Sequence, residues 1–305
     1  MVQKFKKIFE FLLKWFPTEQ HCIDYLEEII WNNNPVSPYD PNSKVYKLPN
    51  NQYKCSKTNK RFNIKIGTIF ENTKLSLQTW FYAFYVFDRK KGISSVELAK
   101  EIGVSQRTAW FVLHRLRESS DCSIFKTMLK DFVEIDETYL GGSNPNRHWN
   151  KKVPNSQGRS WKDKVSLLVM IKRGGCAIVQ VVPNVKKKTL ETIIRENVEE
   201  GSNVYTDEWL AYNGLGKWYK HEIVNHRFKQ YVNGKASTNS AENFNSCLKR
   251  GIYGTYHWVK KKNVQRYANE FAFRYNARNY SDKERFDLML SSTVGKRLTY
   301  QELIS

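Results

Sequence analysis

The sequence predicts an α/β protein whose mixed sheet is covered by helices and follows a helical segment and a small irregular N-terminal module. Three observations support this. Strand-like stretches at 132–140, 164–173 and 176–184 follow one another closely. A helical pattern at 187–200 comes next, with its apolar residues on one face. The stretch NVYTD then forms a short strand ending at Asp207, and helical patterns follow it. The order is three strands, a helix, a strand and further helices.

The composition favours a polyanionic partner. The chain has 305 residues, with 50 Lys and Arg against 30 Asp and Glu, and a formal net charge of +20. That length allows two or three domains. Aromatic residues (17 Tyr, 17 Phe and 9 Trp) accompany the basic ones and can stack or pack beside phosphate contacts, which favours nucleic acid. A membrane surface is the weaker alternative, and no apolar run approaches the roughly 20 residues of a spanning helix.

The cysteines and the N-terminus predict a cytoplasmic protein. The five cysteines are scattered and odd in number, which argues against a disulfide framework and fits a reducing compartment. Apolar residues recur at helical spacing through the first 17 residues, but Glu10 and Lys14 interrupt any signal-peptide core. We therefore expect a packed amphipathic helix there.

Residues 1–62 are predicted to combine this helix with an irregular module. Asn, Pro and Ser crowd the stretch WNNNPVSPYDPNSK. Two short runs, Tyr46–Leu48 and Tyr53–Cys55, are compatible with a hairpin.

Residues 63–122 are predicted to be helical and to contain a helix-turn-helix. Ser94 with Glu97 forms a capping-box pattern, Gly103 marks a turn, and Ser105 can cap a second helix. The second helix has a predicted buried face of Ala109, Val112, Leu113 and Leu116. The alternative is an ordinary packed helix pair, but the basic context favours DNA binding. The residues expected to face DNA are Ser105, Gln106, Arg107, Thr108 and Arg115.

The sheet segments differ in pattern. In the first, Val133 and Ile135 alternate with Glu134 and Asp136. The second, KVSLLVMIKR, is almost continuously apolar, as a central buried strand should be. The pair Gly174-Gly175 marks a tight hairpin to the third. The last strong helical pattern, NVQRYANEFAFRYNAR, has an inward face led by Val264, Tyr267 and Phe271.

Three carboxylates on separate elements suggest a divalent-metal site. Asp136 and Asp207 occupy strand positions, and Glu242 begins a helical pattern. Phosphodiester cleavage needs an activated attacking oxygen and a stabilised leaving oxygen, and two Mg²⁺ ions about 4 Å apart can supply both. Mg²⁺ prefers hard oxygen ligands and keeps several waters, so a few carboxylates suffice. Lys249 lies 249 − 242 = 7 residues after Glu242, about two helical turns, so it shares that face and, with Arg250, can hold the DNA backbone.

Each of these residues also has an ordinary structural interpretation. Asp136 is flanked by Glu134 and Glu137, and such a strand edge is often only solvated. Asp207 can be a helix N-cap, and Glu242 can complement a helix macrodipole. The alternative for the two basic residues is a solvated helix end. The spacing alone leaves both interpretations open.

Several stretches together resemble the DDE transposases of bacterial insertion sequences, in the ISXO-like branch. They are VEIDETYLGG, YTDEWLAYNGL, NHRFKQYVNGKASTNSAENFNSCLKRGIYGTYH and VQRYANEFAFRYNARN. The stretch KKGISSVELAKEIGVSQRTAWFVLHRLRE resembles the helix-turn-helix that precedes their catalytic domain. The resemblance runs from about residue 20 to 280, with the blocks in the right order. It implies a ribonuclease-H-like catalytic domain over 128–280. Residues 281–305, beyond the resemblance, are predicted to form a helix and a short tail.

The resemblance also implies an activity. Asp136, Asp207 and Glu242 match the family's acidic triad, and Lys249 matches the basic residue on the helix of the third acid. The implied function is Mg²⁺-dependent strand cleavage at transposon ends, with Mn²⁺ able to substitute, and transfer of the 3′-hydroxyl to target DNA. The implied partners are double-stranded DNA and a second copy of the chain, in a bacterial cytoplasm in association with the nucleoid. A basic loop supplies further candidate DNA contacts, although each could simply be solvated: His148, Lys151 and Lys152.

A catalytically silent, sequence-specific DNA-binding protein derived from a transposase is the main alternative, and a junction or repair nuclease on the same fold is a third. The silent alternative is motivated by two departures from the family pattern. Where the family commonly has two CxxC pairs of a zinc ribbon, this chain has Ser37, Asp40, Cys55 and Thr58, so we expect no zinc. Asn245 replaces a usual aromatic, which should weaken packing there.

Overall fold

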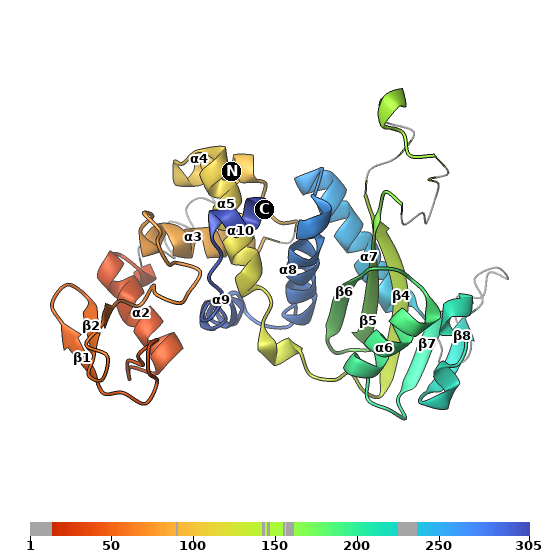
Figure 1. The fold of residues 1–305 in the computed structure, drawn as a ribbon, viewed down its shortest axis with the longest axis horizontal. Helices are drawn as coiled ribbons and strands as arrows, with labels where there is room; N and C mark the ends of the chain where they lie inside the picture. Colours follow the sequence, from red (N-terminus) through yellow and green to blue (C-terminus); the bar gives the residue numbers. More distant parts are fainter. Residues whose placement is uncertain are drawn as a thin grey trace. The chain divides into compact units, whose positions relative to one another are not determined.

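The computed structural model describes residues 14–89, 91–141, 144, 147–154, 156, 162–224 and 237–305 (Figure 1). The predicted N-terminal helix therefore lies mostly outside the described residues. The chain divides into two compact units, one made of residues 1–122 and 280–305 and the other of residues 123–279. Among the described helices, none has the length and apolar character needed to cross a membrane.

The first unit begins with a helix and a small antiparallel sheet. Helix α2 (Glu19–Trp31) is capped by Thr18, whose side chain accepts a hydrogen bond from the His21 N–H. Strands β1 (Val45–Leu48), β2 (Gln52–Cys55) and β3 (Arg61–Phe62) pair in sequence order. The expected hairpin is confirmed, with a third strand added. The buried Tyr53 ring packs edge-on against Trp31, and its hydroxyl donates to the Glu27 carboxylate.

Three of the four positions that the family resemblance compares with zinc-ribbon cysteines make bonds within the protein: Ser37, Asp40 and Cys55. Ser37 is buried, and its Oγ accepts hydrogen bonds from the backbone N–H groups of Tyr39 (3.1 Å) and Asp40 (3.3 Å). Cys55 is buried as well, and its thiol donates to Ser43 Oγ at 3.2 Å. Asp40 forms an ion pair with Lys57 at 2.9 Å. Hydroxyl groups, one thiol and a surface ion pair thus tie this module together.

Three helices follow, and each starts with a serine cap. They are α3 (Leu77–Phe87), α4 (Ser95–Ile102) and α5 (Gln106–Ser119). Ser94 accepts from the Glu97 N–H as predicted, while the Glu97 carboxylate pairs with Arg89 at 3.3 Å. Gly103 ends α4 with a φ of 68°, which confirms the predicted turn, because this left-handed conformation suits glycine. The predicted inward face of α5 is buried in full: Ala109, Val112, Leu113 and Leu116.

Arg115 does not face solvent on α5, and the expectation that it is free to contact DNA is wrong. The residue is only 5% exposed. Its guanidinium donates to the carbonyl oxygens of Leu298 (3.0 Å), Ile69 (2.8 Å) and Glu71 (3.0 Å). It also lies over the Phe111 ring, 4.4 Å from the centroid. These bonds satisfy the buried charge and join three distant chain segments, so Arg115 has a structural role in this unit.

The C-terminal segment is an integral part of the first unit. It forms α9 (Asp282–Ser291) and α10 (Tyr300–Ile304). Phe286 of α9 packs edge-on against Phe81 of α3, with ring centroids 5.3 Å apart. Asp287 accepts a 2.5 Å hydrogen bond from the Tyr25 hydroxyl of α2. Residues expected as a helix and a tail therefore help to close the core of this unit.

The second unit contains the predicted mixed sheet. Its strands are β4 (Phe132–Leu140), β5 (Val165–Lys172), β6 (Ala177–Val182), β7 (Asn203–Asp207) and β8 (Lys220–Val224). The spatial order is β6-β5-β4-β7-β8. Strand β5 pairs antiparallel with both β4 and β6, whereas β7 runs parallel to both β4 and β8. The sequence interpretation missed β8, an edge strand whose residues are mostly exposed.

Helices cover both faces of this sheet (Figure 1). On one face, α6 (Lys187–Asn197) buries Leu190, Ile193 and Ile194 against Val133 and Ile135. On the other face lie α7 (Asn239–Gly251) and α8 (Val264–Asn276). These two helices approach closely at Gly251, where an added Cβ would lie 2.0 Å from an atom of the Phe271 ring.

Side-chain amides of α8 bond the outer edge of β6. Gln265 accepts from the Val181 N–H at 2.7 Å and donates to the Val179 carbonyl at 2.9 Å. Asn276 accepts from the Ala177 N–H at 2.6 Å and donates to the carbonyl of the same residue at 3.0 Å. Backbone groups that an edge strand would leave to water are thus paired with a helix.

Candidate active site

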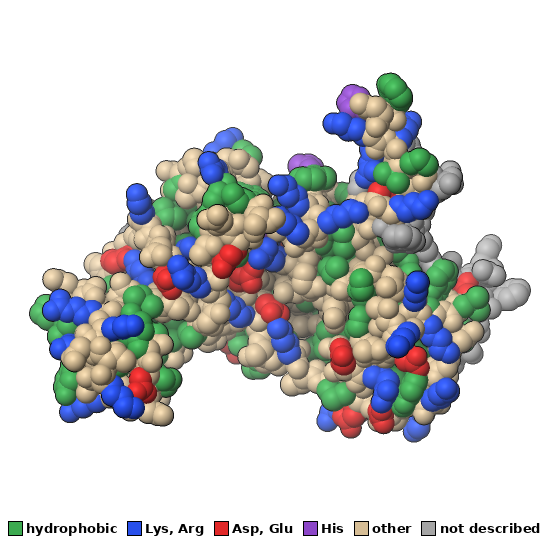
Figure 2. Space-filling view, viewed as in Figure 1, with side chains coloured by type: hydrophobic (Ala, Val, Ile, Leu, Met, Phe, Trp, Pro, Cys, Tyr) green, Lys and Arg blue, Asp and Glu red, His purple; other side chains and the backbone are tan. Residues whose placement is uncertain are grey.

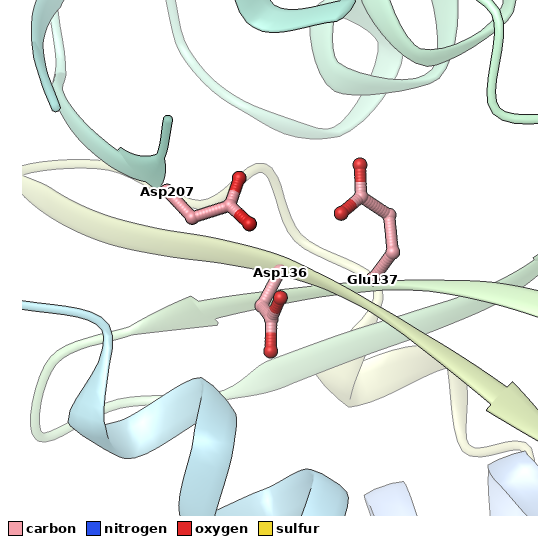
Figure 3. A group of neighbouring side chains, drawn as sticks. All are labelled: Asp136, Glu137 and Asp207. Carbon is pink, nitrogen blue, oxygen red and sulfur yellow. The ribbon is translucent and has the colours of Figure 1, made fainter. Parts of the chain in front are cut away.

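Three carboxylates meet where β4 and β7 part (Figure 3). Asp136 and Glu137 are neighbours in β4, and Asp207 is the last residue of β7. Carboxylate oxygens of the three residues all lie within 4.8 Å of one another. The pairing of the two parallel strands ends at Glu134 and Tyr205, so the acids lie just beyond it, where the strand end brings Asp207 beside β4. Two of these acids were predicted, and Glu137 was not.

Asp136 and Glu137 leave β4 on opposite sides, as neighbours in a strand do (Figure 3). Asp136 faces α7, where the side chain of Asn245 donates to it. Glu137 lies on the other side, near the buried Tyr212, whose pKa is raised by burial and then by the charge of Glu137. Asp207, at the end of β7, lies close to both side chains, so carboxylates from opposite faces of β4 belong to one cluster.

The acidic cluster raises the pKa of Asp136. Burial of the carboxyl group is the largest cause, and the charge of Asp207 is the second, with a smaller part from Glu242. The hydrogen bond from Asn245 acts in the opposite direction. The net effect raises the pKa of Asp136 to about 6. Burial and the neighbouring acids together therefore favour the protonated form of Asp136.

Glu242 lies on the same cavity but outside the closest group. It is in the first turn of α7, exposed, and its carboxylate accepts a 3.3 Å hydrogen bond from Thr238 Oγ1. Its charge still acts on Asp136. Lys249, two turns further along α7, lines the cavity as well. The structure thus brings Asp136 and Asp207 into one cluster and places Glu242 and Lys249 on the wall beside it.

The cavity has a volume of about 1160 Å³. Its acidic lining adds Glu208 and Asp163 to the residues already named. Asp163 is buried and pairs with Arg147 at 3.3 Å. The basic residues of the lining are Arg147, Lys164, Lys249 and Lys261. The basic side chains of this lining can therefore bind a polyanion while the carboxylates hold a metal ion.

The residues of the cluster suit a divalent cation such as Mg²⁺. They offer hard carboxylate oxygens at mutual distances that one or two ions can bridge, with no sulfur or imidazole donor in the group. The raised pKa of Asp136 has like-charge repulsion among its causes, and a bound cation would relieve that repulsion. The donor set therefore passes the chemical test for the metal that the sequence predicts.

Glu134 has a function that sequence reasoning missed. Two residues before Asp136 on the same face of β4, it is only 1% exposed. Its carboxylate accepts from the backbone N–H groups of Ser240 (2.6 Å) and Ala241 (3.3 Å), in the first turn of α7. It also accepts from Arg173 Nε (2.7 Å) and approaches the Ser237 hydroxyl at 3.4 Å. A carboxylate on β4 thus caps the helix that carries Glu242.

Asn245 is polar where the family pattern has an aromatic residue, and the structure gives it a specific contact. It is 5% exposed, and its Nδ2 donates to Asp136 Oδ2 at 2.7 Å. Its Oδ1 is buried and accepts no hydrogen bond from the described residues. This direct bond to the cluster was not predicted from the sequence, and the expected weakening of packing at Asn245 stays a prediction.

The other predicted DNA contacts in this unit lie on the surface. His148, Lys151 and Lys152 are exposed around the short 3₁₀ helix η3 (Trp149–Lys151) and do not line the cavity. Figure 2 shows basic side chains on this projecting segment and over the rest of the viewed face. Arg250 is exposed and donates to Cys247 Sγ at 3.2 Å.

The predicted contacts at the start of α5 are mostly exposed. Ser105 caps the helix by accepting from the Thr108 N–H at 3.2 Å. Gln106 donates to Ser95 Oγ at 2.9 Å, and Arg107 donates to the Tyr300 hydroxyl at 2.8 Å. These residues belong to the first unit, whereas the acidic cluster belongs to the second.

Comparison with known proteins gives a match to one family model and to two relatives. A family model described as the ISXO2-like transposase domain matches residues 128–276. An uncharacterized protein in transposable element ISH50 of Halobacterium salinarum is 26% identical over 295 residues, covering 92% of this chain and 99% of that protein. An uncharacterized transposase-like protein of Haemophilus influenzae is 33% identical over 97 residues, covering 32% of this chain and 77% of that protein.

Solved structures with detectable similarity include complexes of Mos1. The Mos1 strand transfer complex is 14% identical, covers 71% of this chain and 78% of the Mos1 chain, and has a TM-score of 0.30. A pre-cleavage Mos1 transpososome covers 96% of each chain at 14% identity, with a TM-score of 0.29. Scores this low carry no weight for the activity.

Proposed function

The chain belongs to the family of ISXO2-like transposases, and from that premise we propose that it cuts DNA strands at the ends of a transposable element and joins the exposed 3′-hydroxyl to target DNA. One observation carries the proposal. Asp136 and Asp207 meet at adjacent strands in a cavity that Glu242 and Lys249 also line. Acids alone are common on protein surfaces, but acids beside cations in one cavity suit a metal and a phosphodiester together.

The metal-holding residues are Asp136, Asp207 and Glu242, with Glu137 as a fourth carboxylate in reach of the first two. Divalent cations bound there would activate the attacking oxygen and stabilise the leaving oxygen. Mg²⁺ is the expected ion, and Mn²⁺ can replace it because both take oxygen ligands.

The chain's own groups orient this site. Asn245 holds Asp136 through its amide hydrogen bond, which leaves the second carboxylate oxygen free to turn toward the cluster. Glu134 fixes the start of α7 to β4 and so keeps Glu242 beside the cavity. Lys249 binds a DNA phosphate and so positions the DNA strand next to the acids. Such a phosphate contact does not depend on the DNA sequence.

The remaining assignments belong to the same proposal. The strand order β6-β5-β4-β7-β8 supports a ribonuclease-H-like catalytic domain. The pair α4 and α5 acts as a helix-turn-helix, reading DNA with Gln106, Arg107 and Thr108, while Ser105 caps its second helix. The chain works as a dimer or larger assembly, because two transposon ends must be held together.

A strand-cleavage assay tests the activity. The substrate is duplex DNA carrying the gene's own flanks, incubated with Mg²⁺ or with EDTA, and the proteins are wild type, Asp207→Asn and Glu222→Gln. The last is a matched control, an exposed acid of β8 outside the cavity. We expect discrete Mg²⁺-dependent nicks from wild type and the control and none from Asp207→Asn.

Equal nicking by Asp207→Asn would refute the proposed site. Salt-sensitive binding to the flanks without any nicks, from all three proteins, would instead support the silent DNA-binding protein.

A further inference from the structure

An aromatic turn borders the cavity that contains the acids. Helix α7 continues into η7 (Ile252–Tyr256), a π-helical turn. His257 follows with a φ of 58°, a left-handed conformation unusual for a residue with a side chain. Trp258 comes next and is 68% exposed, and Tyr253 is 46% exposed. Both rings line the cavity together with Asp136 and Lys249.

This turn is held firmly. The Tyr253 hydroxyl donates to the Gly141 carbonyl at 3.1 Å, which ties η7 to the end of β4. His257 Nδ1 lies 3.1 Å from the Tyr253 carbonyl oxygen. The Tyr256 hydroxyl donates to Glu270, a fully buried acid of α8. The exposed rings are therefore presented by an anchored turn.

Core packing does not account for Trp258. A tryptophan that is two-thirds exposed contributes little to the core, while the left-handed His257 before it costs conformational free energy. π-Helical turns and such backbone outliers are concentrated at functional sites. A flat apolar ring beside a polar cavity points to a flat apolar ligand.

We propose that Trp258, with Tyr253 next to it, stacks on an unpaired base at the end of a DNA strand whose phosphates lie along the cavity. The inference rests on the proposed function, because it assumes that DNA enters this cavity. The cations of the lining, Lys164, Lys249 and Lys261, can meet phosphates, and the proposed divalent cations would offset its acids, so DNA is favoured over a protein partner. A base inside a duplex has both faces covered by its neighbours, so an unpaired base at a strand end is the occupant that best fits an exposed ring.

A binding experiment with two DNA probes tests the stacking. Both probes are 20-bp hairpins of arbitrary sequence, one blunt and one with a two-nucleotide 3′ overhang that contains 2-aminopurine. Binding is measured at low salt with Mg²⁺ in an Asp207→Asn background, so that DNA is not cut. Stacking on an aromatic side chain is worth about 5- to 150-fold in affinity per base. We expect the overhang probe to bind at least about 5-fold more tightly than the blunt probe, with a change in 2-aminopurine fluorescence.

Three variants separate stacking from folding. Trp258→Ala should lose the preference and the fluorescence change, whereas Trp258→Phe should keep most of both because it retains a ring. Trp15→Ala is the matched control, an exposed tryptophan (54%) of the other unit that does not line the cavity. It should behave as the background protein does, and thermal unfolding will verify that all three variants fold.

Two outcomes would overturn the inference: no preference for the overhang in the background protein, or a preference that survives in Trp258→Ala. Neither depends on strand cleavage. A preference that requires Trp258 would stand even if the nicking assay failed, and nicking without such a preference would leave the proposed function intact.

Discussion

Glu134→Gln is the substitution that tests how α7 is attached to the sheet. The carboxylate is 1% exposed, and every partner it has is a donor: two backbone N–H groups of α7, the Arg173 guanidinium and serine hydroxyls. Glutamine keeps the shape but has one oxygen. Its NH₂ group must face either the helix N-terminus or Arg173, and both of these only donate.

The cost follows from these contacts. Removing one partner of a buried ion pair costs about 3–5 kcal/mol when both charges are sealed from water. The Arg173 side chain is 31% exposed, so water can solvate it in part and the cost falls. We expect about 2–3 kcal/mol, which lowers the melting temperature of a unit of this size by roughly 5–10 °C.

Differential scanning calorimetry of the full chain measures this change, with Glu222→Gln as the control. The substitution should also weaken Mg²⁺-dependent nicking at a temperature where the variant is fully folded, because the start of α7 is no longer held beside Asp136. A melting temperature equal to that of the control would show that the Glu134 contacts contribute nothing net, and the role assigned to Glu134 would be wrong.

Three further predictions concern the cluster, the helix packing and Arg115. Folding raises the pKa of Asp136 from 3.8 to about 6, so the stability of the metal-free protein falls as the pH rises through this range. Asp207→Asn removes part of the repulsion and should stabilise the EDTA-treated protein by about 1 kcal/mol at pH 8 but not at pH 4. Urea unfolding at the two pH values measures this difference. An equal effect at both pH values would contradict the charge explanation. Gly251→Ala places a methyl group 2.0 Å from a ring atom of α8 and should cost about 1–3 kcal/mol, whereas Gly216→Ala, with open space around it, should cost little; equal melting temperatures would mean that the helices separate freely. Arg115→Ala should lower stability by about 2–3 kcal/mol while the folded protein keeps its DNA affinity, and a pure loss of affinity by gel shift would restore the DNA-contact interpretation.

Periodicity was enough to predict the centre of the sheet. The continuous apolar run of β5 reflects burial on both faces, and the alternation in β4 reflects an apolar face against α6 and an acidic face toward α7. The structure has both strands where they were expected. Strand β8 was missed because KHEIV is an exposed edge strand with little alternation of apolar and polar residues. Its pairing with β7 uses backbone groups and is not visible as a pattern in the sequence.

The site was predictable only in part, because several of its contacts span a hundred residues or more. Helical spacing places Arg115 on the flank of α5 but cannot reveal a carbonyl at Leu298. Strand alternation puts Glu137 on the face opposite Asp136, and only the end of β7 between them brings the two acids together. The bond from Asn245 to Asp136 depends on the distance between α7 and β4, which no local pattern encodes.

The amides of Gln265 and Asn276 have a consequence for how copies of the chain can meet. The two residues are 276 − 265 = 11 positions apart, about three helical turns, so both amides project from one side of α8 toward β6. The helix thereby pairs the backbone groups of β6 as a sixth strand would. A shift of α8 along β6 by one helical turn would break all four hydrogen bonds together. A strand of a neighbouring molecule could pair with β6 only if the same four hydrogen bonds were broken. Any assembly of copies on DNA must therefore use surfaces other than this edge of the sheet.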